Sequence, residues 1–342
     1  MVPRFVPWVA AFLSVGSGGD ELLLAPAKGA RLERVWREEL RLGLDGIDLQ
    51  IAGTPLKVTF EEVEFVEHRG FEATDEVEAC AEGRLTEFVR AFDAGEMRFE
   101  LEIDGATMAK AEGENACTGS RVRFRKNDGS DSYEREHVEG PLDEELLDGL
   151  AIDMDLAALL PSKGAAVGAK YAVDSERLRA LFAAGGELGF APAHITAEGL
   201  GVPTEVVLAG ALGSLHELFQ PANPLDGRVE AEYASLADGV ARLVLTLALT
   251  IEAELDAKYS TFSMDGADPS GRKLHVEAEL EGELVLLWDT DANHLRSAKF
   301  EGDLSLESAL RFPFRTSPDA APLDFEGSLE LSGKAEVELA IR

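Results

Sequence analysis

The most regular pattern in this chain is an alternation of apolar and polar residues over residues 243–255, LVLTLALTIEAEL. Apolar residues occupy the odd positions except for the small Ala253, so a strand here presents one apolar face and one mostly polar face. Thirteen extended residues span roughly 43 Å, well beyond the usual strand of five or six residues. The pattern therefore predicts a long strand in a large, curved sheet, with an apolar face that something must cover.

Similar alternation recurs on both sides of a helical stretch. Residues 31–138 alternate in several runs, with Asn127–Gly129 predicting a hairpin turn, and residues 204–342 contain longer runs, with Asp238–Gly239 predicting another. Between them, the leucines of residues 141–161 recur every three or four positions, which predicts a helix. Residues 174–184 predict a second helix, capped by Asp174 or Ser175 and ended by Gly185–Gly186.

These patterns predict a mainly β (α+β) protein, built from long-stranded, curved antiparallel meander sheets with a few short helices between two β-rich lobes. We expect a signal peptide over residues 1–19, an N-terminal β lobe over 20–140, a helical connecting segment over 141–189 and a C-terminal long-stranded β lobe over 190–342. A short phrase, E-G-x-L-x-L, repeats at residues 281–286, 301–306 and 326–331. Glycines shared by neighbouring strands favour a sheet that curls, although a chain rich in Gly and Glu also produces such echoes by chance.

The composition and the first residues of the chain limit which compartment and which partners we expect. The net charge of -33 repels phosphate backbones, so we expect no nucleic-acid partner. Residues 1–19 carry Arg4, an apolar run and then small residues, which is typical of a secretory signal, although Pro7 interrupts the run and an apolar first strand or a misassigned start remains an alternative. No cysteine follows this run to take a lipid anchor. No run of eighteen apolar residues predicts a membrane helix. We therefore expect an exported protein, periplasmic or extracellular, that is neither lipid-anchored nor an integral membrane protein.

The two cysteines, Cys80 and Cys117, predict one disulfide if the chain is exported and two free thiols if it stays in a reducing cytosol. Residues 159–174, LLPSKGAAVGAKYAVD, resemble a phrase in uncharacterised exported bacterial proteins of β-rich composition, in which an aromatic residue follows Val-Gly. That resemblance implies export and carries no activity.

No motif in the chain predicts catalysis, a metal site or a cofactor. Asp289, Asp291 and Asn293 alternate as in half of a calcium loop, but His294 stands where such a loop needs Gly, which favours an acidic hairpin turn. Ser214 lies near His216 without the second Gly of a nucleophile elbow.

Function is therefore predicted from architecture alone: a non-catalytic exported binding protein that holds an apolar small molecule or lipid on its curved sheet. The candidate ligand-facing residues are Leu245, Leu247, Leu249 and Ile251. A carrier needs a cavity of several hundred Å³. The alternatives are a structural or protein-interaction module of the cell envelope, which has no such cavity, and a hydrolase whose site the sequence does not reveal.

Overall fold

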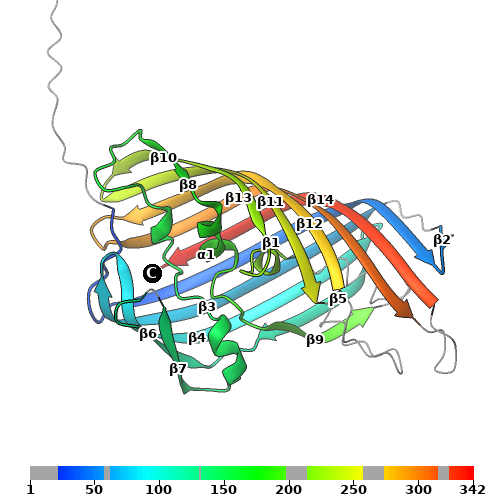
Figure 1. The fold of residues 1–342 in the computed structure, drawn as a ribbon, viewed down its shortest axis with the longest axis horizontal. Helices are drawn as coiled ribbons and strands as arrows, with labels where there is room; N and C mark the ends of the chain where they lie inside the picture. The colour runs from blue at the N-terminus through cyan, green and yellow to red at the C-terminus, as the bar shows by residue number, and fades with distance from the viewer. Residues whose placement is uncertain (1–21, 58–61, 131, 198–213, 257–272, 315–322) are drawn as a thin grey trace, which may run out of the picture.

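A computed structural model describes the chain except for residues 1–21, 58–61, 131, 198–213, 257–272 and 315–322. The expected signal peptide, residues 1–19, lies outside the described residues. Figure 1 shows long strands that run diagonally side by side and curl around a group of short helical turns. Among the described residues, no helix combines the length and the apolar character needed to cross a membrane.

The first half of the chain supplies seven strands that pair mainly with their neighbours in sequence. These are β1 (Arg31–Ile51), β2 (Thr54–Leu56), β3 (Val63–Ala81), β4 (Arg84–Ile103), β5 (Ala106–Asn115), β6 (Arg121–Lys126) and β7 (Tyr133–Glu139). The predicted turn at Asn127–Gly129 is confirmed, since it joins the antiparallel strands β6 and β7 and Gly129 has a φ of 72°.

The second half contributes the remaining strands, most of them longer. These are β8 (Lys170–Val173), β9 (Phe190–Ala197), β10 (Leu225–Ala237), β11 (Val240–Asp256), β12 (Lys273–Asp289), β13 (His294–Phe314) and β14 (Leu323–Ile341). The predicted turn at Asp238–Gly239 is also confirmed: both residues have positive φ and join β10 to β11.

The two β-rich halves form one continuous sheet. Within the described residues its order is β7-β6-β4-β3-β1-β14-β13-β12-β11-β10-β8, and β9 extends the sheet beside β5. The halves meet where β1 pairs with β14, from Arg34 opposite Ile341 to Ile51 opposite Phe325. The antiparallel, mainly β class is thus confirmed, whereas two separate lobes are not found, because the first long strand pairs with the last along nearly its whole length.

Alternation along the strands separates the two faces of the sheet. On β13, Phe300, Leu304 and Leu306 are buried while Glu301, Asp303 and Glu307 are exposed. The same alternation holds on β11, β12 and β14, so most of their apolar side chains lie on the concave face, although Val244, Val285 and Leu287 lie on the other face. A single cluster of buried apolar side chains includes residues of both halves and of the helical turns.

Two glycines of the repeated phrase lie opposite each other on the concave face. Gly282 of β12 pairs with Gly302 of β13, whereas Gly327 lies opposite Leu310 and outside this row. A Cβ at Gly302 would lie 2.4 Å from the Glu281 carbonyl oxygen and 2.4 Å from the Phe300 ring. The bare backbone at this pair leaves room for the Phe300 ring to lie across it.

Short helical turns cover the concave face at one end of the sheet (Figure 1). They are η1 (Glu144–Gly149), η2 (Ala157–Leu159), η3 (Ser175–Leu178), α1 (Arg179–Phe182) and α3 (Leu215–Leu218). The helical segment, residues 141–189, therefore contains 3-10 turns, a single α turn and the short strand β8 in place of the longer helices that leucine spacing predicts. Asp174 caps η3 as expected, because its carboxylate accepts the Glu176 N–H at 3.2 Å.

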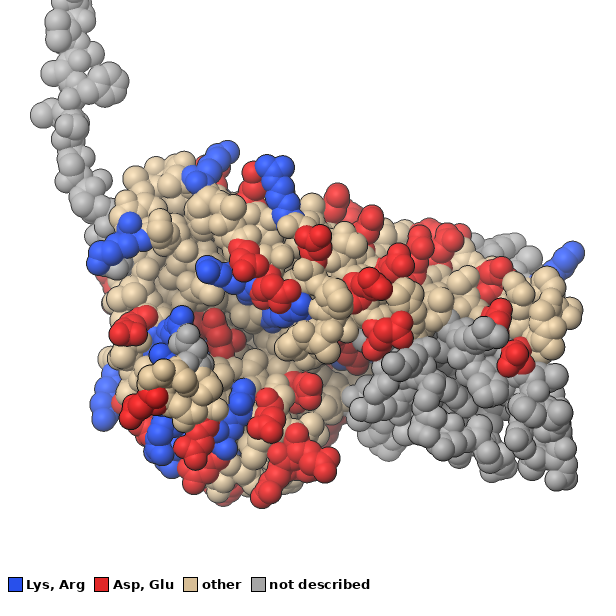
Figure 2. All heavy atoms as spheres, in the orientation of Figure 1, with Lys and Arg blue, Asp and Glu red and all other residues tan. Residues whose placement is uncertain are grey.

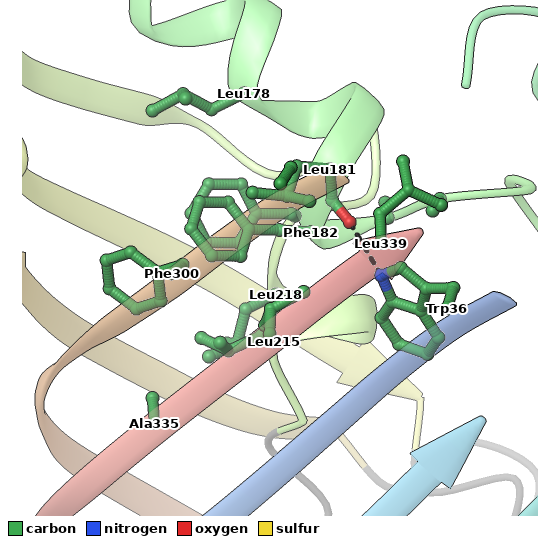
Figure 3. Packing of buried hydrophobic residues seen from close by; sticks show 14 of the residues in the cluster. Trp36, Leu178, Leu181, Phe182, Leu215, Leu218, Phe300, Ala335 and Leu339 are labelled. Atoms are coloured by element: carbon green, nitrogen blue, oxygen red, sulfur yellow. Dashed lines mark hydrogen bonds between the residues drawn. The ribbon is translucent and has the colours of Figure 1, made fainter. Parts of the chain in front are cut away.

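Aromatic side chains pack the helical segment against the sheet (Figure 3). Phe182 meets Phe300 edge-on with centroids 5.0 Å apart, and it packs against Phe219 at 4.3 Å. The Trp36 indole donates to the Leu181 carbonyl at 2.8 Å. Rings of this size bury large apolar areas, and their polar edges need partners when buried, so the segment and the sheet form one core.

The predicted disulfide is wrong, since Cys80 and Cys117 are both free. Cys80 lies one residue before the end of β3, opposite Leu85 of β4, whereas Cys117 lies in the turn whose Gly119 donates to the Phe92 carbonyl of β4. Leu85 and Phe92 are seven residues apart on one strand, roughly 23 Å. A disulfide needs Cα atoms within about 7 Å, so the register of β4 keeps the two thiols apart.

Candidate functional site

Two arginines and two aspartates form a buried ionic network between the sheet and the helical segment. Asp75 of β3 accepts from Arg34 Nε at 2.8 Å and from Arg90 at 2.7 and 2.9 Å. Arg34 also donates to Asp155 at 2.7 Å. Burial alone would raise the pKa of Asp75, but the two guanidinium groups outweigh it and hold that pKa below its ordinary value.

The same two arginines hold the backbone of the helical segment. Arg90 donates to the carbonyl oxygens of Ala151 and Ile152 at 2.8 and 3.2 Å, and Arg34 donates to that of Met154 at 3.1 Å. Arginine suits this role because its planar group carries five donors in a fixed fork. The path of residues 151–155 over the sheet is therefore fixed by polar contacts from β1 and β4.

A second buried polar cluster lies beside α3. Arg69 donates to Glu67 at 2.5 Å and to Glu217 at 3.2 Å, and Glu38 accepts the backbone N–H of His216 at 3.0 Å. Three carboxyl groups thus surround one guanidinium. Burial raises the pKa of Glu38 to about 8 despite the nearby Arg69, and burial together with the Arg69 charge lowers the pKa of His216 to about 3. Near pH 7, Glu38 and His216 are both mainly neutral.

A cavity of about 710 Å³ opens where the helical segment meets the end of the sheet. The N-terminal residues Leu22–Leu24, the β3–β4 turn and the start of β7 line one side, and residues 152–163 line the other. Its apolar lining residues are Leu22, Leu23, Leu24, Leu85, Ile152, Ala157, Ala158, Leu160 and Pro161. Its volume lies in the range of pockets that bind small molecules.

Charged groups also reach this cavity. Arg84, Lys163 and Arg177 are exposed at its rim, as is Glu82. Asp155 is occupied by Arg34, while Asp153 accepts the Asp155 backbone N–H at 2.8 Å. Burial, with the nearby Asp155 charge, raises the pKa of Asp153.

A smaller cavity of about 420 Å³ lies on the convex face around Gly70. Arg37, Arg98 and Lys299 line it together with Glu96 and other glutamates. Charged side chains of both signs make up most of its lining, so this groove suits an apolar molecule less well than the larger cavity does.

The residues singled out from sequence lie elsewhere. Leu245, Leu247, Leu249 and Ile251 are buried on the concave face, as the alternation predicts, but none of them lines the larger cavity. Ser214 caps α3 by accepting the Glu217 N–H at 3.2 Å.

The acidic repeat that begins at Asp289 forms the β12–β13 turn, as predicted. The Asp289 carboxylate accepts the N–H groups of Asp291 at 3.0 Å and Ala292 at 2.8 Å, and Asn293 has a φ of 54°. Across the part of the chain that the structure describes, no group of three or more His, Cys, Asp or Glu side chains is arranged to hold a metal ion.

The sequence already indicated that some charged side chains are buried, although the prediction from apolar periodicity did not take them into account. Arg34 and Glu38 occupy the inward phase of β1, on either side of the buried Trp36. A charged residue at an apolar position in such a pattern indicates a buried, paired group. Its partners come from other strands and from the helical segment, so they could not be named in advance.

Comparison with known proteins does not assign the chain to a family. No protein-family model matches the chain, and no curated protein matches it significantly.

Proposed function

We propose that this protein is a non-catalytic binding protein for an apolar small molecule, which it holds in the 710 Å³ cavity at the end of its curled sheet. One observation carries the proposal: apolar side chains line much of a cavity of ligand size that lies beside the packed core. The site differs from the one expected on β11, where Leu245 and its neighbours are already buried.

The packing around the cavity supports a preformed site. Its walls belong to elements that are fixed independently of any ligand, because Arg90 and Arg34 hold residues 151–155 and the Tyr133 hydroxyl donates to Leu85 at 2.6 Å. A preformed site loses little conformational entropy on binding.

The proposal is tested with the uncharged fluorescent probe N-phenyl-1-naphthylamine, whose emission rises in apolar surroundings. The wild-type protein is expected to bind it saturably, and Ala158→Trp, which places a large ring in the cavity, is expected to weaken binding at least tenfold. Val167→Trp is the matched control, because Val167 is 51% exposed and lies outside the cavity lining. Absence of saturable binding, or equal loss in both variants, contradicts the proposal.

The proposed place of action is outside the cytoplasm, which the signal-like pattern of residues 1–19 supports. The two free cysteines do not support this place of action, since free thiols are what the sequence predicts for a chain in a reducing cytosol. Cys117 is nevertheless fully buried, and burial raises its pKa to about 12, which leaves little reactive thiolate there. The intact mass of protein from its native compartment should correspond to a chain that begins near residue 20; a mass that includes residues 1–19 contradicts export by this signal.

A further inference from the structure

One carboxyl group in the wall of the larger cavity has no ion-pair partner. Asp153 and Asp155 both line that cavity, and the Asp155 carboxylate is bound to Arg34 at 2.7 Å. Asp153 forms no ion pair with any Lys, Arg or His among the described residues; its carboxylate accepts the Asp155 backbone N–H at 2.8 Å. A carboxylate can accept about four hydrogen bonds, so Asp153 can accept a donor from a molecule in the cavity as well.

The nearby arginines do not make up for this missing partner. Arg34 and Arg90 face three carboxyl groups, those of Asp75, Asp155 and Asp153, and the first two of these take all the ion pairs that the two arginines form there. Arg34 still attracts Asp153 at longer range, but burial and the Asp155 charge outweigh this attraction and raise the pKa of Asp153. Because Asp153 is half-buried, its charge is also screened less by salt than an exposed charge is.

The rim of the cavity carries exposed charges of both signs. Glu82, Arg84, Lys163 and Arg177 all lie there in contact with solvent. Arg84 and Lys163 already interact with other groups of the protein, and Arg177 donates to a backbone carbonyl. Solvent and salt weaken the field of such exposed groups, so the half-buried carboxyl of Asp153 has the stronger effect on what the cavity binds.

The field of the whole molecule acts in the same direction as Asp153. The chain carries a net charge of -33, and acidic side chains predominate along the long strands on the face drawn in Figure 2. A strongly negative protein raises the local concentration of cations and lowers that of anions. A positively charged ligand is therefore favoured during its approach as well as in the cavity.

We propose that the ligand is an apolar amine, whose ammonium group donates a hydrogen bond to the Asp153 carboxylate and whose apolar chain lies on Leu85, Ile152 and Leu160. This inference rests on the proposed function and specifies the class of ligand. A buried carboxylate is costly unless it is paired, and an ammonium group supplies both the opposite charge and the N–H donors. Its charge also favours the ionised form of Asp153, which opposes the effect of burial.

The experiment compares dodecylamine, which is protonated near neutral pH, with dodecanol, which has the same chain length without the charge. Each competes with N-phenyl-1-naphthylamine at concentrations below micelle formation. Wild-type protein is expected to bind dodecylamine about tenfold more tightly than dodecanol, as one charge-assisted hydrogen bond provides. The variant Asp153→Asn, which has nearly the same shape, is expected to lose this preference while it keeps its affinity for dodecanol and for the probe.

The matched control is Asp143→Asn. Asp143 accepts the N–H of Glu145, two residues on, just as Asp153 accepts that of Asp155, but Asp143 is exposed and lies outside the cavity lining. The control makes the same change in net charge, so it should keep the preference for dodecylamine and thereby separates Asp153 from general attraction to an acidic surface.

The outcomes distinguish the amine from the carrier function. Equal binding of the two ligands by the wild type, a preference that survives in Asp153→Asn, or one that disappears equally in both variants overturns the amine and leaves the carrier function standing. Failure of both ligands and of the probe to bind overturns the proposed function itself.

Discussion

At the scale of single residues, the most informative positions are charged side chains that the sheet buries. Asp75 has no solvent contact and is held by Arg34 and Arg90. Removing one partner of such a buried network leaves an uncompensated charge and typically costs about 3–5 kcal/mol. These residues therefore fix the position of the helical segment, and with it one wall of the cavity.

Glu38 and His216 make stability depend on pH in opposite directions. The pKa of Glu38 is raised from 4.5 to about 8, so between these values the folded protein holds a proton that the unfolded chain has lost, and stability falls as pH rises. The pKa of His216 is lowered from 6.5 to about 3, so stability rises with pH across that range. The two effects oppose each other from pH 4.5 to 6.5, and only the Glu38 effect remains from pH 6.5 to 8.

We predict that stability falls by roughly 1 kcal/mol per pH unit between pH 6.5 and 8, and that Glu38→Gln reduces this fall. The groups facing Glu38 are Arg69, Glu67, Glu217 and His216, and Glu217, whose pKa burial also raises, acts in the same direction. Urea unfolding at pH 6.5 and 8 measures the slope. Glu39→Gln, on the exposed face of the same strand, is the control and should keep it; an unchanged slope in Glu38→Gln would refute the burial argument.

At the scale of elements, the paired glycines of β12 and β13 allow the helical segment to pack on the sheet. Phe300 lies over Gly282 and Gly302 and contacts Phe182 of α1 from there. The repeated phrase indicated curl in the sheet, and two of its three glycines do form a pair. The third does not, because register is set by the whole length of β13 and β14 and not by the phrase.

We predict that Gly302→Ala destabilises the protein by about 1–3 kcal/mol, or more, since its methyl group would overlap the Glu281 carbonyl oxygen and the Phe300 ring. Gly43→Ala is the matched control within a long strand, because a Cβ there meets only the Ser332 carbonyl oxygen at 3.8 Å. Thermal unfolding of the two variants checks this, and similar midpoints would show that the glycine pair is not needed for packing.

At the scale of the whole molecule, the convex face of the long strands carries like charges directly opposite one another. Glu252, Glu277, Glu307 and Glu330 form a row across β11, β12, β13 and β14, and all four are exposed. Like charges at directly opposite positions destabilise a sheet. The acidic surface therefore opposes folding while it favours solubility.

We predict that Glu307→Gln, in the middle of this row, raises the free energy of unfolding by about 0.5 kcal/mol in low salt, and that 0.5 M NaCl reduces the gain by screening. Glu87→Gln is the control, since Glu87 pairs with Arg125 at 2.7 Å and its loss should not stabilise the protein. Urea midpoints at the two salt concentrations provide the measurement. A gain that does not respond to salt would mean that charge repulsion is not its cause.

The sequence by itself determined the strands, their apolar faces, the turns at Asn127–Gly129 and Asp238–Gly239, and the cap at Asp174, because each depends on residues close together in the chain. Only the tertiary structure decided that β1 pairs with β14, that Cys80 and Cys117 lie apart, and that Arg34 and Arg90 hold residues 151–155. It also decided the place of the cavity, which is lined by residues 22–24, 82–85 and 133, by residues 152–163 and by residue 177. The contacts of Arg90 and the pairing of β1 with β14 join residues from 61 to about 300 positions apart, and their free energy depends on the register and burial of the whole sheet, which no local pattern records.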